Sequence, residues 1–265
     1  MNDTFSFQRY IGLTIHYIHS MKRNPARLIE IIVWPSFELL LFGMLALSVG
    51  ATNNTPLSLG IGILCGVVYW NFSARIIQET IAQFLDDAFS KNLQNLLITP
   101  FSLVELALSL LTSSVIKLCL SFVFLISILY LLIPTFFNSL SIYSVLWLSE
   151  LVAFGSVLSL IALSLLFLFG IRFSFIGWLI STILQVFSCV FFERKILPPI
   201  LQEISYTVPS SYIFESIHAS VSYPHVRQEM SFIPIILIFL YLVCSIVFLH
   251  YAFEYARRHG TLINI

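Results

Sequence analysis

Two carboxylates deep inside apolar stretches are the best candidates for chemistry in this sequence. Glu38 follows Trp34 and Pro35 about eight residues into one apolar run, and Glu150 lies about ten residues into another. At about 1.5 Å per helical residue, each would lie more than about 10 Å from the nearer end of a spanning helix. Charge at that depth is costly unless protonation, a polar neighbour or water relieves it. No Lys or Arg is predicted at comparable depth, so we expect both residues, with Gln185, at a subunit contact or along a hydrated transport path.

The other reactive side chains form no recognisable catalytic or metal-binding pattern. The four cysteines lack the Cys-x-x-Cys or Cys/His spacing of a zinc site, and each falls in a different apolar run: Cys65, Cys119, Cys189 and Cys244. The sequence contains no GxxxxGK[ST], GxSxG or HExxH motif. We therefore predict no ATPase site, no enzyme activity and no bound cofactor or metal for this chain itself.

The amino-acid composition indicates the environment in which these residues lie. Of 265 residues, 58% are hydrophobic and only 10% are charged, whereas soluble domains carry about 25% charged residues. The net charge is zero, so no basic surface is available for a nucleic acid. A soluble enzyme, a disordered chain and a nucleic-acid binder are excluded. The sequence indicates an all-α membrane protein with one transmembrane domain, residues 1–265.

The charged residues divide the chain into spanning segments. Five stretches contain no Asp, Glu, Lys or Arg, and a spanning helix needs about 20 apolar residues. Polar turns with proline at 51–56 and 134–139 subdivide the longer stretches. The pattern predicts six spans, at about 31–50, 57–78, 103–133, 141–169, 174–192 and 231–253.

The distribution of Lys and Arg predicts the orientation. With six spans, both termini lie on one side of the membrane. That side would hold ten basic residues (Arg9, Lys22, Arg23, Arg27, Arg75, Lys91, Lys117, Arg172, Arg257 and Arg258), and the other would hold Arg194, Lys195 and Arg227. Cytoplasmic loops carry the excess of basic residues, so we expect a multi-pass protein of the inner (cytoplasmic) membrane with both termini in the cytoplasm.

Two cytoplasmic segments have helical patterns outside the spans. Apolar and aromatic residues recur at helical spacing over about 4–23, which predicts a helix in the membrane interface, with a frayed leader as the alternative. A second amphipathic helix is predicted at about 80–98, ending before Pro100. Its polar face is acidic, which favours docking on a soluble protein over anionic lipid. Its expected contact residues are Phe84, Leu85, Asp86, Asp87, Phe89, Lys91 and Leu93.

The external loop at about 193–225 predicts two short helices before the last span. Proline occupies the first turn of each, where its missing N–H costs nothing. The residues that define this loop are Pro198, Pro199, Pro209, Tyr212 and Glu215. These helices either re-enter the outer leaflet, which is tolerated where protein or a cavity covers the backbone, or form a surface cap.

The order of these segments resembles the ABC-2 type permeases, the membrane subunits of ABC exporters. The resemblance rests on KRNPARLIEIIVWP at 22–35, SKNLQNLLITPFS at 90–102, and LPP followed by VPSSY and Glu215 in the external loop. It covers essentially the whole chain. The chain departs from the pattern at Phe191-Phe192-Glu193, where many members have a proline.

The resemblance implies a transport subunit that depends on partners. In that family two separate ATPase subunits bind ATP and Mg and contact the helix after the second span. Two permeases, here as a homodimer or a heterodimer, pass the substrate between them and outward. A lipid-like, amphipathic or drug-like substrate suits the apolar composition, and a polysaccharide or glycolipid stays open. The alternatives are a secondary transporter or another polytopic membrane protein, although no internal repeat relates 1–133 to 134–265.

Overall fold

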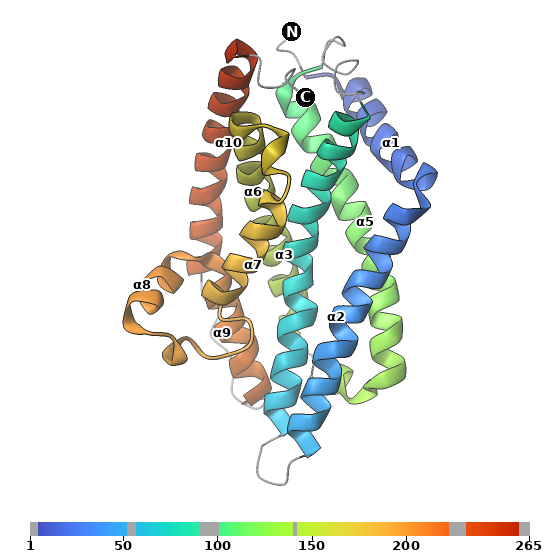
Figure 1. Cartoon of the computed structure of the whole chain (residues 1–265). Coiled ribbons are helices and arrows are strands. Elements are labelled where there is room, and N and C mark those ends of the chain that lie inside the picture. The colour runs from blue at the N-terminus through green and yellow to red at the C-terminus, as the bar shows by residue number, and fades with distance from the viewer. Residues whose placement is uncertain (1–4, 52–56, 91–100, 140–141, 223–231, 260–265) are drawn as a thin grey trace.

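The computed structural model of the chain describes residues 5–51, 57–90, 101–139, 142–222 and 232–259. In these residues it contains nine α-helices, three short 3₁₀ turns and no strand. The long helices run alongside one another as a bundle, and the short helix α8 projects to one side of it (Figure 1). The helix α1 and the C-terminal end of α10 lie at the same end of the bundle (Figure 1).

Five helices are long and apolar enough to cross a membrane. Their bounds are α2 (Pro25–Ala51), α3 (Leu57–Phe89), α5 (Leu103–Leu132), α6 (Ser144–Phe169) and α10 (Ile233–His259). In the apolar segment of α3, 89% of the residues are buried inside the chain. The corresponding fraction is 28% for α2, 28% for α5 and 22% for α10. The helix α3 is therefore the centre of the bundle, and the outer helices present apolar surface to the bilayer. The chain is a membrane-embedded helical protein.

Small residues allow α3 and α6 to approach closely. A Cβ added at Gly155 of α6 would lie 2.8 Å from Cα and O of Ser73 on α3. The Ser73 hydroxyl donates to the carbonyl of Leu151, at 2.7 Å. The close crossing thus allows a hydrogen bond from a side chain of α3 to the backbone of α6, in a region where no water is available to the hydroxyl.

The segment predicted as an interfacial helix forms α1 (Phe7–Arg23). It packs on α5, where the Tyr10 hydroxyl lies 2.8 Å from Thr112 Oγ1 and Arg9 lies 3.1 Å from Glu105. Glu105 also closes a capping box with Ser102 at the start of α5. Tyr17 is buried at 2% exposure. One face of α1 therefore contacts protein, while Phe5 and Phe7 are exposed.

The fifth predicted span, 174–192, differs from the structure. The helix α7 covers only Ile176–Phe187, which at about 1.5 Å per residue is about 18 Å and too short to cross a bilayer. It is preceded by Gly170, which has φ 75°, and followed by Cys189 in the left-handed region with φ 55°. The break near Gly170 matches the predicted gap between the spans at 141–169 and 174–192. The absence of charge over 173–192 concealed the break at Cys189, because hydropathy reports apolarity and not backbone direction.

The predicted boundary between the second span and the amphipathic helix at 80–98 also differs. The helix α3 runs without interruption from Leu57 to Phe89. No Gly or Pro occurs between 67 and 89, so nothing in the local sequence ends the helix. Its polar residues there find partners on neighbouring helices, as described below.

The external segment contains the two predicted short helices, α8 (Pro199–Thr207) and α9 (Pro209–Ser222), after a 3₁₀ turn at Arg194–Ile196. Pro199 occupies the first turn of α8. The helix α9 packs against α3, α6 and α10, and buries Ile213, Phe214 and Ile217 at 1% exposure or less. It is part of the bundle core; its re-entry into the bilayer stays a prediction.

Candidate functional site

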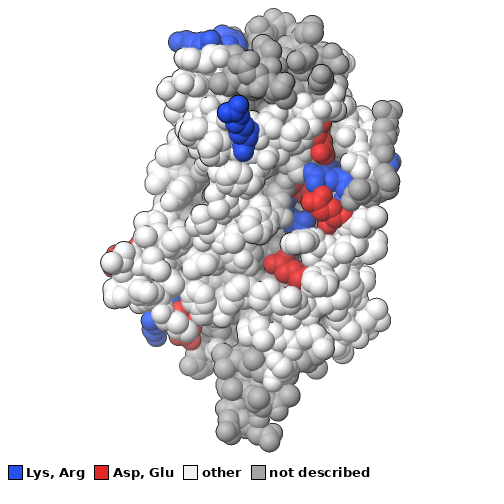
Figure 2. Space-filling model, viewed as in Figure 1, with Lys and Arg blue, Asp and Glu red and all other residues white. Residues whose placement is uncertain are grey.

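A cavity of about 330 Å³ opens between α2, α3 and α7. Each helix supplies one stripe of lining residues at helical spacing. They are Trp34, Phe37, Glu38, Leu41 and Phe42 from α2, Trp70, Asn71, Ala74, Arg75 and Gln78 from α3, and Trp178, Ser181, Thr182 and Gln185 from α7. Charged side chains of both signs gather beside α2 and α3, and the other charged side chains on this face are scattered (Figure 2).

The predicted transport residues separate into two groups. Glu38 and Gln185 line the same cavity, although they are far apart in sequence. Glu150 lies on α6, where it is 7% exposed, and it does not line this cavity. The structure therefore brings two of the three together and leaves the third within the helix core.

Arg75 corrects the expectation that no basic residue shares the depth of Glu38. It lines the cavity with Glu38 and is only 4% exposed. Its Nη2 atom is buried and makes no hydrogen bond within the described residues. The sequence prediction counted Arg75 with the basic residues of the cytoplasmic side, near the end of a second span at about 57–78. The unbroken α3 places it inside the bundle.

Polar contacts fix the cavity walls to one another. The Gln78 amide donates to Ser181 Oγ at 3.2 Å and joins α3 to α7. The Asn71 amide donates to the Val67 carbonyl at 2.8 Å, within α3. The cavity thus combines rigid polar walls with aromatic rings, the usual composition of a site for an organic ligand.

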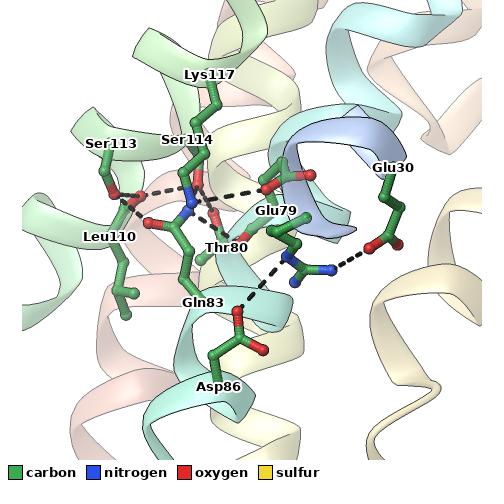
Figure 3. Close-up of polar contacts among 10 residues, drawn as sticks. Glu30, Glu79, Thr80, Gln83, Asp86, Leu110, Ser113, Ser114 and Lys117 are labelled. Atoms are coloured by element: carbon green, nitrogen blue, oxygen red, sulfur yellow. Dashed lines mark hydrogen bonds and ion pairs between the residues drawn. The ribbon is translucent and has the colours of Figure 1, made fainter. Parts of the chain in front are cut away.

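A second polar cluster lies between α2, α3 and α5, and we call it the α3–α5 polar network (Figure 3). Lys117 and Glu79 form an ion pair at 3.8 Å, with both side chains at least 96% buried. Arg27 lies 2.6 Å from Glu30 and 3.5 Å from Asp86. Three carboxylates, those of Glu79, Asp86 and Glu30, act electrostatically on the Arg27 guanidinium.

Neutral side chains complete the network. Thr80 lies 3.0 Å from Ser114, and the Gln83 amide donates to Ser114 at 2.9 Å and accepts from Ser113. Sequence reasoning missed this cluster. The available signal was the spacing of Ser109, Ser113 and Lys117 along one face of the third span, opposite the polar residues Thr80 and Gln83.

The predicted partner-docking face at 80–98 requires a correction. Phe84, Leu85 and Asp87 are buried within the chain; Phe84 stacks edge-on against Phe167 at 5.3 Å. The apolar face is covered by α6 and α1 of this chain, so it needs no partner to cover it. Lys91 and Leu93 lie outside the described residues. Phe89, at 63% exposure, and Asp86, whose side chain is 42% exposed, are the accessible members.

Asp87 is instead held by α1. Its carboxylate lies 3.1 Å from His16 Nε2. Burial and the nearby charge of Asp87 raise the pKa of Tyr17 well above its usual range, so Tyr17 stays a neutral member of this contact.

In the external segment Arg194 connects the predicted loop residues. Its guanidinium lies 3.2 Å from Glu215, and its Cζ lies 4.3 Å and 4.7 Å from the ring centres of Tyr206 and Tyr212. Pro198 caps α8 next to Pro199, and Pro209 begins α9. The cluster fastens α8 and α9 to each other.

The same segment contains a smaller cavity of about 180 Å³. His218 lines it, and its Nε2 lies 3.1 Å from the carbonyl oxygen of Cys189. Burial lowers the pKa of His218, so this histidine is neutral at physiological pH.

A scan against known protein families finds no matching family, and no curated protein matches the chain. Among the described residues, no group of three or more His, Cys, Asp and Glu side chains could hold a metal ion.

Proposed function

We propose that the chain is the permease subunit of an ATP-driven exporter of the ABC-2 type. It would sit in the inner (cytoplasmic) membrane and move a lipid-like, amphipathic or drug-like substrate out of the cytoplasm or the inner leaflet. Two ATPase subunits, carrying ATP and Mg, would drive it, and a second permease copy would complete the path.

The cavity between α2, α3 and α7 is the observation that carries this proposal. It places Glu38, Arg75 and Gln185 on one surface inside a helical membrane protein. Intramembrane ionisable residues of this kind mark substrate or ion pathways. Residues 25–35 of the motif-like segment 22–35 form the first part of α2, one wall of the cavity, and the LPP segment leads into α8.

The end of α3 at Phe89 supports an ATPase contact at the same end of the bundle as α1 (Figure 1). Phe89 is 63% exposed, and residues 90–102 carry the family resemblance. A partner that binds here would press on a helix that continues to the cavity.

The test uses the permease purified together with the separate ABC ATPase subunit that the proposal requires. Phe89→Ala removes an exposed ring, so it should lower ATPase association and substrate-stimulated ATP hydrolysis about tenfold or more, since exposed aromatic anchors dominate docking energies. Ile142→Ala is the matched control, because Ile142 is 89% exposed and lies far from α3 in sequence. Equal association and hydrolysis in both variants would contradict the proposal.

A secondary transporter is the second candidate, and the α3–α5 polar network favours it. Buried charged residues on several helices, including Glu79 and Lys117, are typical of ion relays. Proteoliposomes discriminate between the two. Transport by the permease alone under an imposed proton gradient would support the secondary transporter, whereas transport that requires the ATPase and ATP supports the exporter.

A further inference from the structure

We propose that the cavity between α2, α3 and α7 binds a hydrophobic organic cation, with its positive group at Glu38 and its apolar groups against Trp34, Trp70 and Trp178. This inference names the substrate class and rests on the proposed function, in which the cavity is the transport surface.

The first argument is the balance of charge around the cavity. Glu38 and Arg75 are the two charged residues among the described lining residues. Three carboxylates, those of Glu79, Glu38 and Glu30, act electrostatically on the Arg75 guanidinium. Arg75 is in turn the cation that acts on Glu38. Glu79 also pairs with Lys117, and Arg27 pairs with Glu30 and Asp86. This group therefore has four carboxylates and three cations, so one negative charge is left without a cation. A positive ligand group is the natural complement.

The second argument is the aromatic lining. Three tryptophans and two phenylalanines surround the cavity: Trp34, Trp70, Trp178, Phe37 and Phe42. Indole faces attract cations most strongly among aromatic rings, above all when the cation is poorly hydrated. Trp70 is 3% exposed and forms a fixed wall, whereas Trp34 and Trp178 are 56% and 57% exposed and can cover a ligand.

The third argument is the set of neutral donors and acceptors on α7. Ser181, Thr182 and Gln185 line the cavity opposite Glu38, and Ser181 and Thr182 donate to the Trp178 carbonyl at 2.9 Å. Their hydroxyl protons are already engaged, so they offer lone pairs to the cavity. Such oxygen atoms suit a cation better than an anion.

Two matched probes test the charge preference. Tetraphenylphosphonium and tetraphenylborate have nearly the same size and opposite charge. Binding of each is measured by equilibrium dialysis to the full chain in nanodiscs, with empty nanodiscs subtracted. We expect saturable binding of tetraphenylphosphonium alone. It should also change the tryptophan fluorescence, because three of the four tryptophans line the cavity.

Variants locate the binding group. Glu38→Gln should raise the Kd for tetraphenylphosphonium by at least about tenfold. Glu150→Gln is the matched control, since Glu150 is also a deep carboxylate but lies outside the cavity, and it should leave Kd unchanged. Trp178→Leu, at an exposed position, should raise Kd about three- to tenfold; it carries the test if Glu38→Gln fails to fold.

Three results would overturn the inference: no saturable binding of tetraphenylphosphonium, equal affinity in wild type, Glu38→Gln and Trp178→Leu, or saturable binding of tetraphenylborate that Arg75→Gln abolishes. The last result would assign the cavity to anions. These measurements use the permease without ATPase or ATP. Cation binding without ATP-driven transport would therefore contradict the proposed function alone, and ATP-driven transport without cation binding would contradict this inference alone.

Discussion

The cavity and the α3–α5 polar network contain the same kinds of residue, but the surroundings of their polar groups differ. In the network, Gln83 contacts two serines and a backbone carbonyl, and Lys117 faces Glu79. Both regions keep a buried polar atom without a hydrogen bond among the described residues, Oε2 of Glu79 in the network and Nη2 of Arg75 in the cavity. The Glu79 atom faces the Lys117 ammonium at 3.8 Å, whereas Arg75 borders about 330 Å³ of space. Polar groups that satisfy one another hold helices together, whereas polar groups facing space are available to a ligand.

The largest expected effect on stability is in the network. Lys117→Met leaves the buried Glu79 carboxylate without its ion-pair partner, with only the more distant charges of Arg27 and Arg75 acting on it, which should lower the free energy of unfolding by about 3 kcal/mol. Thermal or denaturant unfolding of the purified protein in nanodiscs measures this loss. Adding Glu79→Gln removes the unpaired charge and should restore most of it. A single variant as stable as wild type would show that the pair is not structural.

A smaller loss is expected at the neutral part of the network. Gln83→Leu keeps the side-chain size but leaves Ser113 and Ser114 without their amide partner. Both hydroxyls keep their bonds to the Leu110 carbonyl, so the variant loses two hydrogen bonds between helices, which should cost about 1–2 kcal/mol. The same unfolding measurement applies, and Gln202→Leu in α8 is the control, since its amide bonds to backbone at 2.7 Å near the surface. Equal losses in both variants would contradict a special role for the network.

The smallest effect on stability is expected in the cavity. Glu38→Gln keeps the volume and removes the charge at a site lined by open space, so the free energy of unfolding should change by about 1 kcal/mol or less. Transport should nevertheless fall sharply, because the charge is what a substrate would contact. If this variant transports like wild type from about pH 6 to 8, ionisation of Glu38 is irrelevant to function. If it unfolds as readily as Lys117→Met, the distinction between the two regions fails.

Sequence reasoning predicted the elements better than their contacts. Charge-free runs located α2, α5, α6 and α10 because hydropathy is a local property. The continuity of α3 was missed, since Glu79 and Asp87 look like solvent-exposed charges when their partners Lys117 and His16 are unknown. The sequence analysis gave Glu38 and Gln185 the same expected role but did not predict that they line one cavity. The position of Arg75 in the same cavity was not predicted, because the rotation and pairing of helices depend on tertiary contacts.

The 33 residues of α3 have a mechanical consequence. One helix carries the exposed Phe89 at its end, the network at Glu79 and Gln83, and the cavity wall from Trp70 to Gln78. From Gln78 to Phe89 the distance along the axis is about 16 Å, with no proline or glycine between them to act as a joint. A displacement of the Phe89 end by a partner would therefore reach the cavity wall through α3 itself.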